Sequence, residues 1–338
     1  MGSLNGSESR RPTGAMKVGL DSYGLKPLGL SPIRLLEWAR AHGAEGVQFS
    51  EPPAEADDAS FLRDLGQAAD GLGLYLEWGG GQHIPFDPAT GRAIDIAAVN
   101  RKAAGQAAAL GLTAVRSCSS GLMRWRPDDP PVRAYLEAMA AALGSQIPML
   151  RDLDVTLAFE THFEFTTFEL LRLFDMCGAE PGGALGVCLD TMNLLTLLEE
   201  PAAAARRALP WIVMTHIKDG GILEVPQGFR SFPAPAGAGI VDFASIIADL
   251  AGLGRAVPLS IEDHGGDFLI PAADPDFRSK LPDLSAEEES SLRRLAGETQ
   301  RKMETEELAI VSRPDWPRVC EARMAANIVA VRRMAEGA

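Results

Sequence analysis

Four short apolar runs, each ending on a side chain that can bind a metal ion, constrain the fold of this chain more than any other feature. LAFE ends at Glu160, GVCLD at Asp190, IVMTH at His216 and LSIE at Glu262. Such runs, alternating with helix-length segments, are typical of parallel strands buried on both faces. The four positions lie 26 to 46 residues apart, about one strand–helix unit each. A single strand-terminal carboxylate often only caps the next helix. Four such side chains on successive strands favour strand ends that meet at one shared rim of the sheet.

The rest of the chain continues this alternation to eight strand–helix units, which predicts an α/β fold, a (β/α)₈ TIM barrel. Caps and apolar periodicity predict the helices. Strands are expected over 17–23, 46–51, 74–78, 112–120, 155–160, 184–190, 211–219 and 258–263. Helices are expected over 31–43, 61–73, 95–110, 132–151, 166–178 and 201–209, from Asp242 onward, and over 319–335.

Several segments depart from the alternation. Residues 1–15 are polar and rich in Gly and Ser, so we expect a disordered leader before a single barrel domain over 16–338. The glycines at 79–81 predict a loop or turn, and 220–243 holds too many Gly and Pro residues for a regular element. After strand eight, 265–318 is longer than a barrel loop needs. Its stretch from Ser285 predicts a solvated helix, and this insertion would overhang the mouth or meet another subunit.

Composition excludes several classes of function. The net charge is −14 with a pI near 4.9, and no basic stripe is present, so nucleic acid is not expected as a partner. No apolar run reaches the roughly 18 residues of a membrane span. Cysteines at 118, 177, 188 and 320 show no metal-binding or disulfide spacing, which favours a reduced cytoplasm.

The donors at the predicted rim suit a divalent metal ion. Three carboxylates and one imidazole match Mn²⁺, Co²⁺, Mg²⁺ or Zn²⁺. Because side chains alternate along a strand, a residue two positions after a ligand points the same way. This places His162 beside Glu160, Lys218 beside His216, and His264 beside Glu262. The rim thus combines a metal site with groups that move protons.

A metal bound to a substrate carbonyl or an adjacent hydroxyl would stabilise an enediolate after loss of a neighbouring C–H proton. Glu160 and Glu262 are the candidate base and acid. His162 is the alternative base, since its imidazole titrates near neutral pH, or else an ordered donor. Lys218 would steady an oxyanion, or pair with Asp219 or Glu262 as scaffolding.

Other rim residues are candidates for substrate contacts. Hydroxyl groups would be bound by Gln48, Glu77, Arg116, Asn193 and His264, although each could equally be a rim hydrogen-bonding residue without a specific role. Trp78 and Trp125 would stack on an apolar sugar face or an aglycone, unless they only pack. No cluster of Lys and Arg points to a phosphate, which favours an unphosphorylated small molecule.

Taken together, these motifs resemble the xylose isomerase-like TIM-barrel superfamily of sugar phosphate isomerases and epimerases. The resemblance lies in LAFETH, GVCLDTMN, THIKD, PAGAGIVDF and LSIEDH, and covers about 17–265 and the last helix. It implies one divalent ion, often Mn²⁺, held by Glu160, Asp190, His216 and Glu262, with the two Glu residues exchanging a proton with a keto sugar. Tagatose 3-epimerase-like members carry a His where this chain has Asn193, which argues against simple ketose epimerisation. The endonuclease IV branch needs more His ligands than five histidines supply.

A second branch that resembles this chain is the large subunit of bacterial C-glycoside deglycosidases. It implies metal-assisted elimination on 3-oxo-glycosides with His162 as the base, and a small partner subunit that the insertion could meet. Otherwise a homo-oligomer is expected. A barrel that binds sugar without catalysis is the remaining alternative, and it would tolerate Glu160→Gln.

Overall fold

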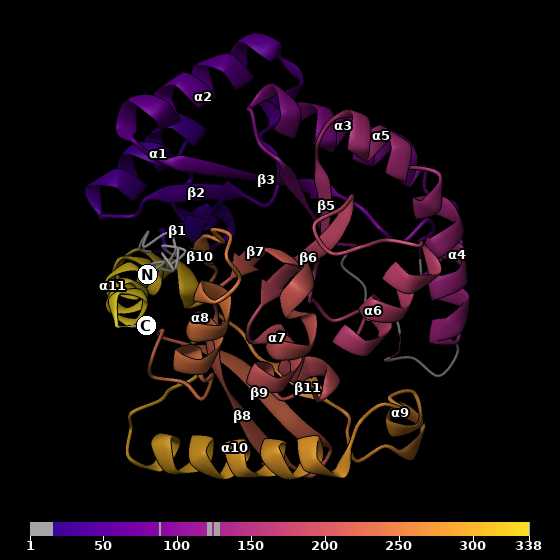
Figure 1. Cartoon of the computed structure of the whole chain (residues 1–338). Helices are drawn as coiled ribbons and strands as arrows, with labels where there is room; N and C mark the ends of the chain where they lie inside the picture. Colours follow the sequence, from indigo (N-terminus) through magenta and orange to yellow (C-terminus); the bar gives the residue numbers. More distant parts are fainter. Residues whose placement is uncertain (1–15, 88, 120–123, 125–128, 338) are drawn as a thin grey trace, which may run out of the picture.

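The computed structural model describes residues 16–87, 89–119, 124 and 129–337 (Figure 1). Within this part, eight parallel strands follow one another around a barrel in the order β10-β1-β2-β3-β4-β5-β6-β7. Their bounds are β1 Val18–Asp21, β2 Gly46–Phe49, β3 Tyr75–Gly81, β4 Ala114–Ser117, β5 Thr156–Glu160, β6 Leu185–Asp190, β7 Ile212–His216 and β10 Leu259–Ile261. A single bridge between Ile217 and Ile261 joins the two end strands. The predicted TIM barrel is confirmed.

Helices surround the strands and cover their outer face (Figure 1). They are α1 Pro32–Ala41, α2 Ala59–Leu72, α3 Ile96–Ala109, α4 Val132–Gly144, α5 Ile147–Asp152, α6 Thr167–Met176, α7 Pro201–Ala208, α8 Phe243–Ala251 and α11 Trp316–Glu336, with 3₁₀ turns η1 Ser22–Leu28, η2 Ala54–Asp57, η3 Asn193–Leu197 and η4 Leu209–Trp211. Side-chain caps that the sequence predicted start some of them. Thr166 and Glu169 form a reciprocal capping box, and the Asp242 carboxylate accepts from Ser245 N at 3.1 Å.

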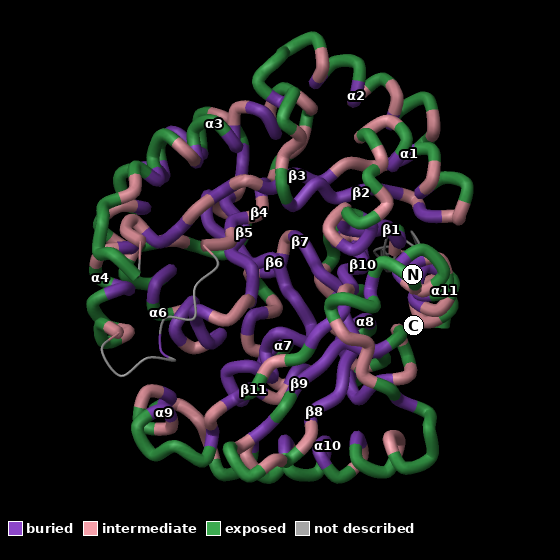
Figure 2. Tube along the Cα trace, turned by 180° about the vertical axis from the view of Figure 1, so that it is seen from behind, coloured by how far each residue is buried: buried purple, intermediate pink, exposed green. Residues whose placement is uncertain are grey.

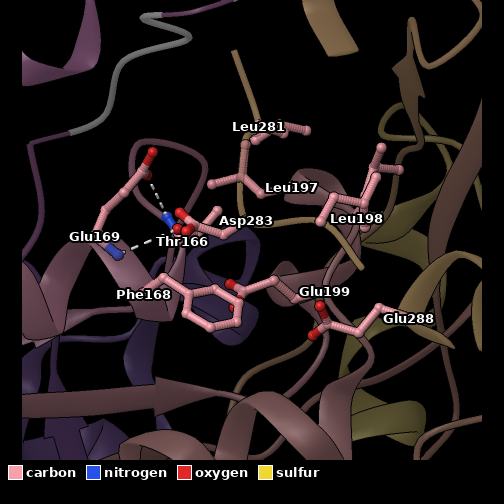
Figure 3. A pocket seen from close by; sticks show the side chains of 10 residues that line it. Thr166, Phe168, Glu169, Leu197, Leu198, Glu199, Leu281, Asp283 and Glu288 are labelled. Carbon is pink, nitrogen blue, oxygen red and sulfur yellow. Dashed lines mark hydrogen bonds between the residues drawn. The ribbon is translucent and has the colours of Figure 1, made fainter. Parts of the chain in front are cut away.

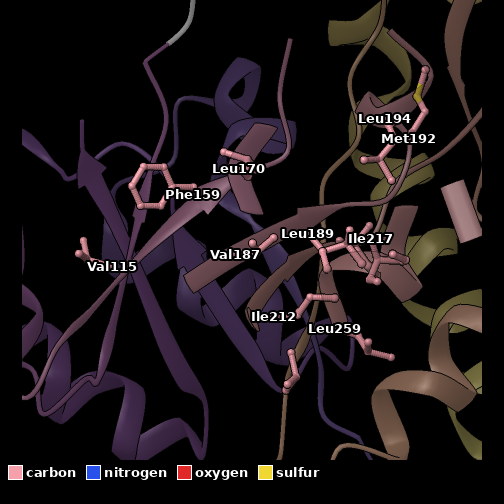
Figure 4. Close-up of a cluster of buried hydrophobic side chains, with 14 of the residues drawn as sticks. Val115, Phe159, Leu170, Val187, Leu189, Met192, Leu194, Ile212, Ile217 and Leu259 are labelled. Carbon is pink, nitrogen blue, oxygen red and sulfur yellow. The ribbon is translucent and has the colours of Figure 1, made fainter. Parts of the chain in front are cut away.

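The core lies between the strands and the inner faces of these helices. Figure 2 shows the strands almost wholly buried and the helices buried on one side only. Buried apolar side chains on successive strands meet in this layer, among them Val115, Phe159, Val187, Leu189, Ile212 and Leu259 (Figure 4). Burying one such side chain contributes about 2 kcal/mol. This packing fixes the strands, and with them the positions of the strand ends.

The expectation of no regular element over 220–243 was wrong. β8 Asp219–Val225 and β9 Gly228–Ala234 pair as an antiparallel hairpin, and β11 Phe268–Ile270 pairs with β9. The glycines here permit close packing. A Cβ on Gly221 would lie 2.6 Å from the Phe232 ring, and one on Gly220 would lie 2.6 Å from the sulfur of Met192. Glycine count alone therefore misled the prediction.

The insertion after strand eight packs on this hairpin sheet. It contains β11, α9 Pro275–Ser279 and α10 Ala286–Glu304. The predicted helix at Ser285 is confirmed as α10, but it is solvated on one face only. Leu292 and Leu295 are buried, and Thr299 Oγ1 accepts from Ile222 N of β8 at 3.1 Å. Figure 1 shows α10 lying along β8.

A small pocket marks the place where the insertion meets the barrel (Figure 3). Thr166, Phe168 and Glu169 of the α6 start line one side, and Leu281, Asp283 and Glu288 of the insertion line the other. The dashed contacts in Figure 3 are the capping-box bonds of α6. None of the predicted site residues lines this pocket, so we regard it as part of the seam between the insertion and the barrel.

Two further boundaries differ from the expectation. The helix expected over 132–151 is two helices, since α4 ends at Gly144 and α5 starts at Ile147 with Pro148 in its first turn. The glycines at 79–81 are part of β3, where a Cβ on Gly79 would lie 2.1 Å from Ser50 O. The described chain has no helix long and apolar enough to span a membrane.

Candidate metal centre

The four predicted ligands meet at the carboxyl ends of their strands. Glu160 ends β5, Asp190 ends β6, His216 ends β7 and Glu262 directly follows β10. One donor atom from each lies within 4.8 Å of the other three, and all four residues are buried. The sequence pattern thus corresponds to one compact cluster of three carboxylates and one imidazole.

Contacts at both ring nitrogens fix the orientation of the His216 imidazole. Nδ1 lies 3.2 Å from Glu160 Oε1 and 3.4 Å from Glu262 Oε2. Nε2 faces Gln48 Oε1, an acceptor, so Nε2 carries the hydrogen and donates it to Gln48. Nδ1, which faces the carboxylates, is then the nitrogen that would bind an ion in place of a proton. Metal-binding histidines are held in this way, with the second ring nitrogen donating to a protein group.

Glu160 is held from behind by Arg116 of the neighbouring strand β4. Both Nε and Nη2 of Arg116 donate to Glu160 Oε2, with the Nε contact at 2.7 Å. The other carboxylate oxygen, Oε1, is the one that faces His216. Arg116 therefore fixes the carboxylate, and the hydroxyl-binding role that the sequence allowed for Arg116 stays a prediction.

Lys218 lies on the opposite side of the cluster. Its Nζ is 3.1 Å from Glu262 Oε2, 3.5 Å from Asp190 Oδ2 and 3.4 Å from Asn193 Oδ1. The sequence left open whether Lys218 pairs with Asp219 or with Glu262, and the structure shows the pair with Glu262. Asp219 instead accepts hydrogen bonds from four backbone amides, those of Gly220, Gly237, Gly239 and Val241.

These bonds explain the PAGAGIVDF motif. The Asp219 carboxylate holds the loop before α8, and Gly239 has no room for a side chain, since a Cβ would lie 2.1 Å from Asp219 Oδ1. Burial raises the pKa of Asp219 to about 6, against the opposing effect of the backbone amides. Asp219 is thus a scaffold residue next to the centre.

Electrostatics keep two of the carboxylates ionised. Burial acts to raise the pKa of Glu160, but Arg116 and His216 outweigh it and hold that pKa well below its usual range. Burial acts likewise on Glu262, where Lys218 and His216 hold the pKa well below its usual range. Both residues therefore stand ready as anionic ligands or as bases at neutral pH.

Asp190 and His216 respond to the same cluster of charges. Burial raises the pKa of Asp190 to about 7, against the lowering effect of Lys218. Burial acts to lower the pKa of His216, but Glu160 and Glu262 raise it well above its usual value. An imidazole that attracts protons this strongly marks a place where a positive charge is stabilised.

The donor set fits a divalent cation. Three carboxylate oxygens and one imidazole nitrogen converge, and Lys218 contacts only one side of them. The amide nitrogens of Gln48 and Asn193 are buried beside the cluster without a hydrogen-bond partner among the described residues. Buried donors of this kind are normally satisfied, so they are suited to a ligand oxygen. Mn²⁺, Mg²⁺, Co²⁺ and Zn²⁺ all accept such donors.

The remaining predicted residues are placed as follows. His162 lies two residues beyond Glu160, with Nδ1 3.1 Å from Glu164 Oε2. His264 is close to Glu262 and Lys218, and burial lowers its pKa to about 4. Glu77 accepts from the Ser260 hydroxyl. Trp125 lies outside the described residues, so its stacking role stays a prediction.

Of the two roles that the sequence left open for Trp78, stacking on a sugar and packing, the structure shows packing. Its side chain is fully buried, and Nε1 donates to Gln106 of α3 at 3.2 Å. On β3 the residue after Glu77 must point outward to the helix layer, because side chains alternate along a strand. The alternation in the sequence carried this signal.

Sequence reasoning missed three neighbours of the predicted ligands. Asp21, at the end of β1, lies 3.9 Å from His216 Nε2 and accepts from the Ser50 hydroxyl. Cys118 and Glu164 lie beside His162. Asp21 ends an apolar run as the ligands do, so the same pattern could have found it.

Comparisons with known proteins agree with this fold. A family profile described as Xylose isomerase-like TIM barrel matches residues 36–293. The 3-oxo-isoapionate decarboxylase of Pectobacterium atrosepticum is 27% identical over 243 residues, which cover 68% of this chain and 79% of that protein.

Solved structures share the fold. D-psicose 3-epimerase from Clostridium cellulolyticum, determined with D-tagatose, has a TM-score of 0.59 at 14% identity, covering 83% of this chain and 99% of that one. A xylose isomerase-like TIM barrel protein from Mycobacterium smegmatis, in complex with magnesium, has a TM-score of 0.58 at 18% identity, covering 82% and 98%. Because the family profile spans more than half of the 338 residues, the chain belongs to the xylose isomerase-like TIM barrel family.

Proposed function

We propose that this protein is a divalent-metal-dependent sugar isomerase or epimerase that moves a proton beside the carbonyl of a keto sugar. The observation that carries the proposal is the placement of Glu160 and Glu262 on the same imidazole nitrogen, at 3.2 and 3.4 Å, inside a set of four converging metal donors. Family membership supports carbohydrate chemistry at this rim.

The bound ion would act as a Lewis acid toward the substrate carbonyl. The protein's own groups do the proton transfer. Arg116 fixes the Glu160 carboxylate, and the lowered pKa values of Glu160 and Glu262 keep both ionised. One of them accepts the proton from the carbon next to the carbonyl and, as a carboxylic acid, returns a proton to the substrate. Lys218, beside Glu262, stabilises negative charge that develops on the substrate oxygen.

Two unpartnered amides are suited to orient the sugar. Asn193 Nδ2 is buried at the centre, and Asn193 Oδ1 accepts a hydrogen bond from Lys218 Nζ. Gln48 Nε2 is buried behind His216. Each can donate to a sugar hydroxyl. Asn193 occupies the place of the His in tagatose 3-epimerase-like members, so we expect its amide to select among keto sugars.

A second function is favoured by a specific observation. The relative with 27% identity is a 3-oxo-isoapionate decarboxylase, and His162 is paired with Glu164 as a base would be. We therefore keep lyase chemistry on a 3-oxo sugar acid or 3-oxo-glycoside as the alternative, with His162 as the base. In the deglycosidase form of this alternative, the exposed face of α10 would meet a small partner subunit.

Solvent-deuterium exchange tests the proposal. The metal-loaded protein is incubated in D₂O with a panel of free keto sugars and 3-oxo sugars, and deuterium at the carbon beside the carbonyl is read by mass spectrometry. Deuterium in a free keto sugar supports the isomerase or epimerase, and CO₂ or aglycone release supports the lyase. A protein that binds no metal and exchanges no deuterium would be a sugar-binding barrel.

Matched variants separate the two reactions. Glu262→Gln should abolish exchange in either case, because it removes a metal ligand. His162→Asn should leave exchange intact in the isomerase and abolish it in the lyase. A His162→Asn variant that loses product release but still binds metal would overturn the isomerase proposal.

A further inference from the structure

A second group of metal-binding side chains lies on the rim beside the first. Cys118 follows β4, and His162 and Glu164 follow β5. One donor atom from each, a thiol sulfur, an imidazole nitrogen and a carboxylate oxygen, lies within 4.8 Å of the other two. None of the three belongs to the set formed by Glu160, Asp190, His216 and Glu262.

One separation in this group is close to that expected in a tetrahedral site, and the other two lie within 4.8 Å. His162 Nδ1 is 3.1 Å from Glu164 Oε2. Ligand atoms about 2.05 Å from a tetrahedral zinc ion are about 3.3 Å apart, so a small shift would accommodate an ion between them. The carboxylate side chain is 1% exposed and the imidazole side chain 16% exposed. Cys118 is half-buried, so an ion could enter from the side of Cys118 and His162.

Aromatic contacts hold the imidazole in place. The His162 ring lies 3.7 Å from the Phe163 ring, centroid to centroid, and Phe163 lies 4.4 Å from Phe268 of β11. Behind the group, the buried His83 bonds Ser117 Oγ through Nδ1 at 2.9 Å, next to Cys118 in the chain. A site that is supported by packed neighbours needs little reorganisation to bind.

The donor chemistry differs between the two groups. The first set is mostly carboxylate and suits Mn²⁺ or Mg²⁺, whereas a thiolate selects softer ions such as Zn²⁺. We propose that Cys118, His162 and Glu164 form a second divalent-metal site, of the zinc class, with water completing the coordination. This inference concerns metal binding alone. It is compatible with the isomerase or epimerase reaction, whereas a His162 that binds an ion is not the base of the lyase alternative.

Cobalt substitution tests the site without any activity measurement. The chelated full-length protein is titrated with Co²⁺, and a thiolate-to-cobalt charge-transfer band in the near ultraviolet reports a bound cysteine. We expect this band in the wild type and its loss in Cys118→Ser. Cys177→Ser, which changes another half-buried thiol, is the matched control and should keep the band. Bound zinc should fall from two ions per chain to one in Cys118→Ser.

Glu262→Gln separates the two centres. This variant should keep the charge-transfer band of the Cys118 site and lose the ion of the first centre. A wild type that shows the band but binds no ion at Glu160, Asp190, His216 and Glu262 would overturn the proposed function and leave the second site standing. A wild type that binds a single ion without a charge-transfer band, or a band that survives in Cys118→Ser, would overturn the second site. If Cys118→Ser does not fold, protection of the wild-type Cys118 thiol from alkylation by Zn²⁺ decides the question, and equal labelling with and without Zn²⁺ overturns the proposal.

Discussion

The two halves of the barrel rim carry polar side chains at equivalent places but use them differently. On β1 to β4, Asp21 accepts from Ser50, Glu77 accepts from Ser260, and Arg116 donates to Glu160. On β5, β6, β7 and β10, the donors face one another across His216. The polar residues of the second half also bond to neighbours such as Arg116 and Lys218, but each turns one donor atom toward a shared centre. The first half acts as the support of the second.

Removing one carboxylate charge from each half of the rim should give the largest effect and sharpen the comparison between the two halves. Glu262→Gln should release the bound ion and lower kcat/KM about a thousandfold, because it removes an anionic ligand and a proton-transfer group. Metal content by mass spectrometry and exchange rates measure both. Glu77→Gln makes the same chemical change on β3 and should keep its metal. Equal metal loss in both variants would break the distinction between the halves.

A substitution of Lys218 tests whether the half of the rim formed by β5, β6, β7 and β10 needs a positive charge when no metal ion is bound. Lys218→Met leaves Asp190 and Glu262 without their counter-charge, and breaking such a buried pair costs about 3 kcal/mol or more. Urea unfolding of the metal-free protein should show this loss. Added Mn²⁺ should then stabilise the variant more than the wild type.

An equal loss with and without Mn²⁺ would mean that Lys218 acts through packing alone. Lys218→Arg is the charge-keeping control, and it should retain most of the stability of the metal-free form.

The pH dependence of stability tests the supporting half. Burial raises the pKa of Glu77 from its ordinary value of 4.5 to about 7, against the Ser260 hydroxyl. The folded state therefore binds this proton more tightly than the unfolded state, and stability falls as pH rises from 4.5 through about 7, by at most roughly 3 kcal/mol. Glu77→Gln should flatten this part of the curve when unfolding free energies are compared at about pH 5 and about pH 8. An unchanged slope would show that Glu77 is ionised throughout.

The smallest effect is expected at Gln48, which links the two halves. Gln48→Leu removes the acceptor of His216 Nε2, and loss of such a partner weakens metal affinity about 10- to 100-fold. Competition with a chromophoric chelator measures this affinity. Gln48→Glu retains an acceptor and should bind the ion more tightly than Gln48→Leu. If both variants bind alike, Gln48 does not orient the imidazole.

Local sequence patterns predicted the barrel and the residues at its rim because both follow from short-range rules. Apolar runs of strand length, helix caps such as Ser31 and Asp242, and the two-residue alternation needed no distant information. Glu160, Asp190, His216 and Glu262 could be selected for the same reason: each directly ends an apolar run.

The errors came where a residue's role depends on a distant partner. The glycines of β3 and β8 signalled turns, yet they lie in strands because Ser50, Phe232 and Met192 leave no space for a side chain. For Arg116 the sequence left a substrate contact and a rim hydrogen bond open, because its partner, Glu160, is 44 residues away in the chain. The group at Cys118 was missed because its members lie after the ends of β4 and β5, and none of them ends an apolar run.

The sequence by itself determined the order of the strands, the helices that separate them, and the delivery of polar groups to one rim, since these depend on periodicities of a few residues. Tertiary structure alone decided which of those groups pair with each other and which stay free for a ligand. That choice depends on which strand lies beside which and on the few ångströms between side chains such as Gln48 and His216, 168 residues apart in the chain. Barrel closure creates those distances, and no local pattern encodes them.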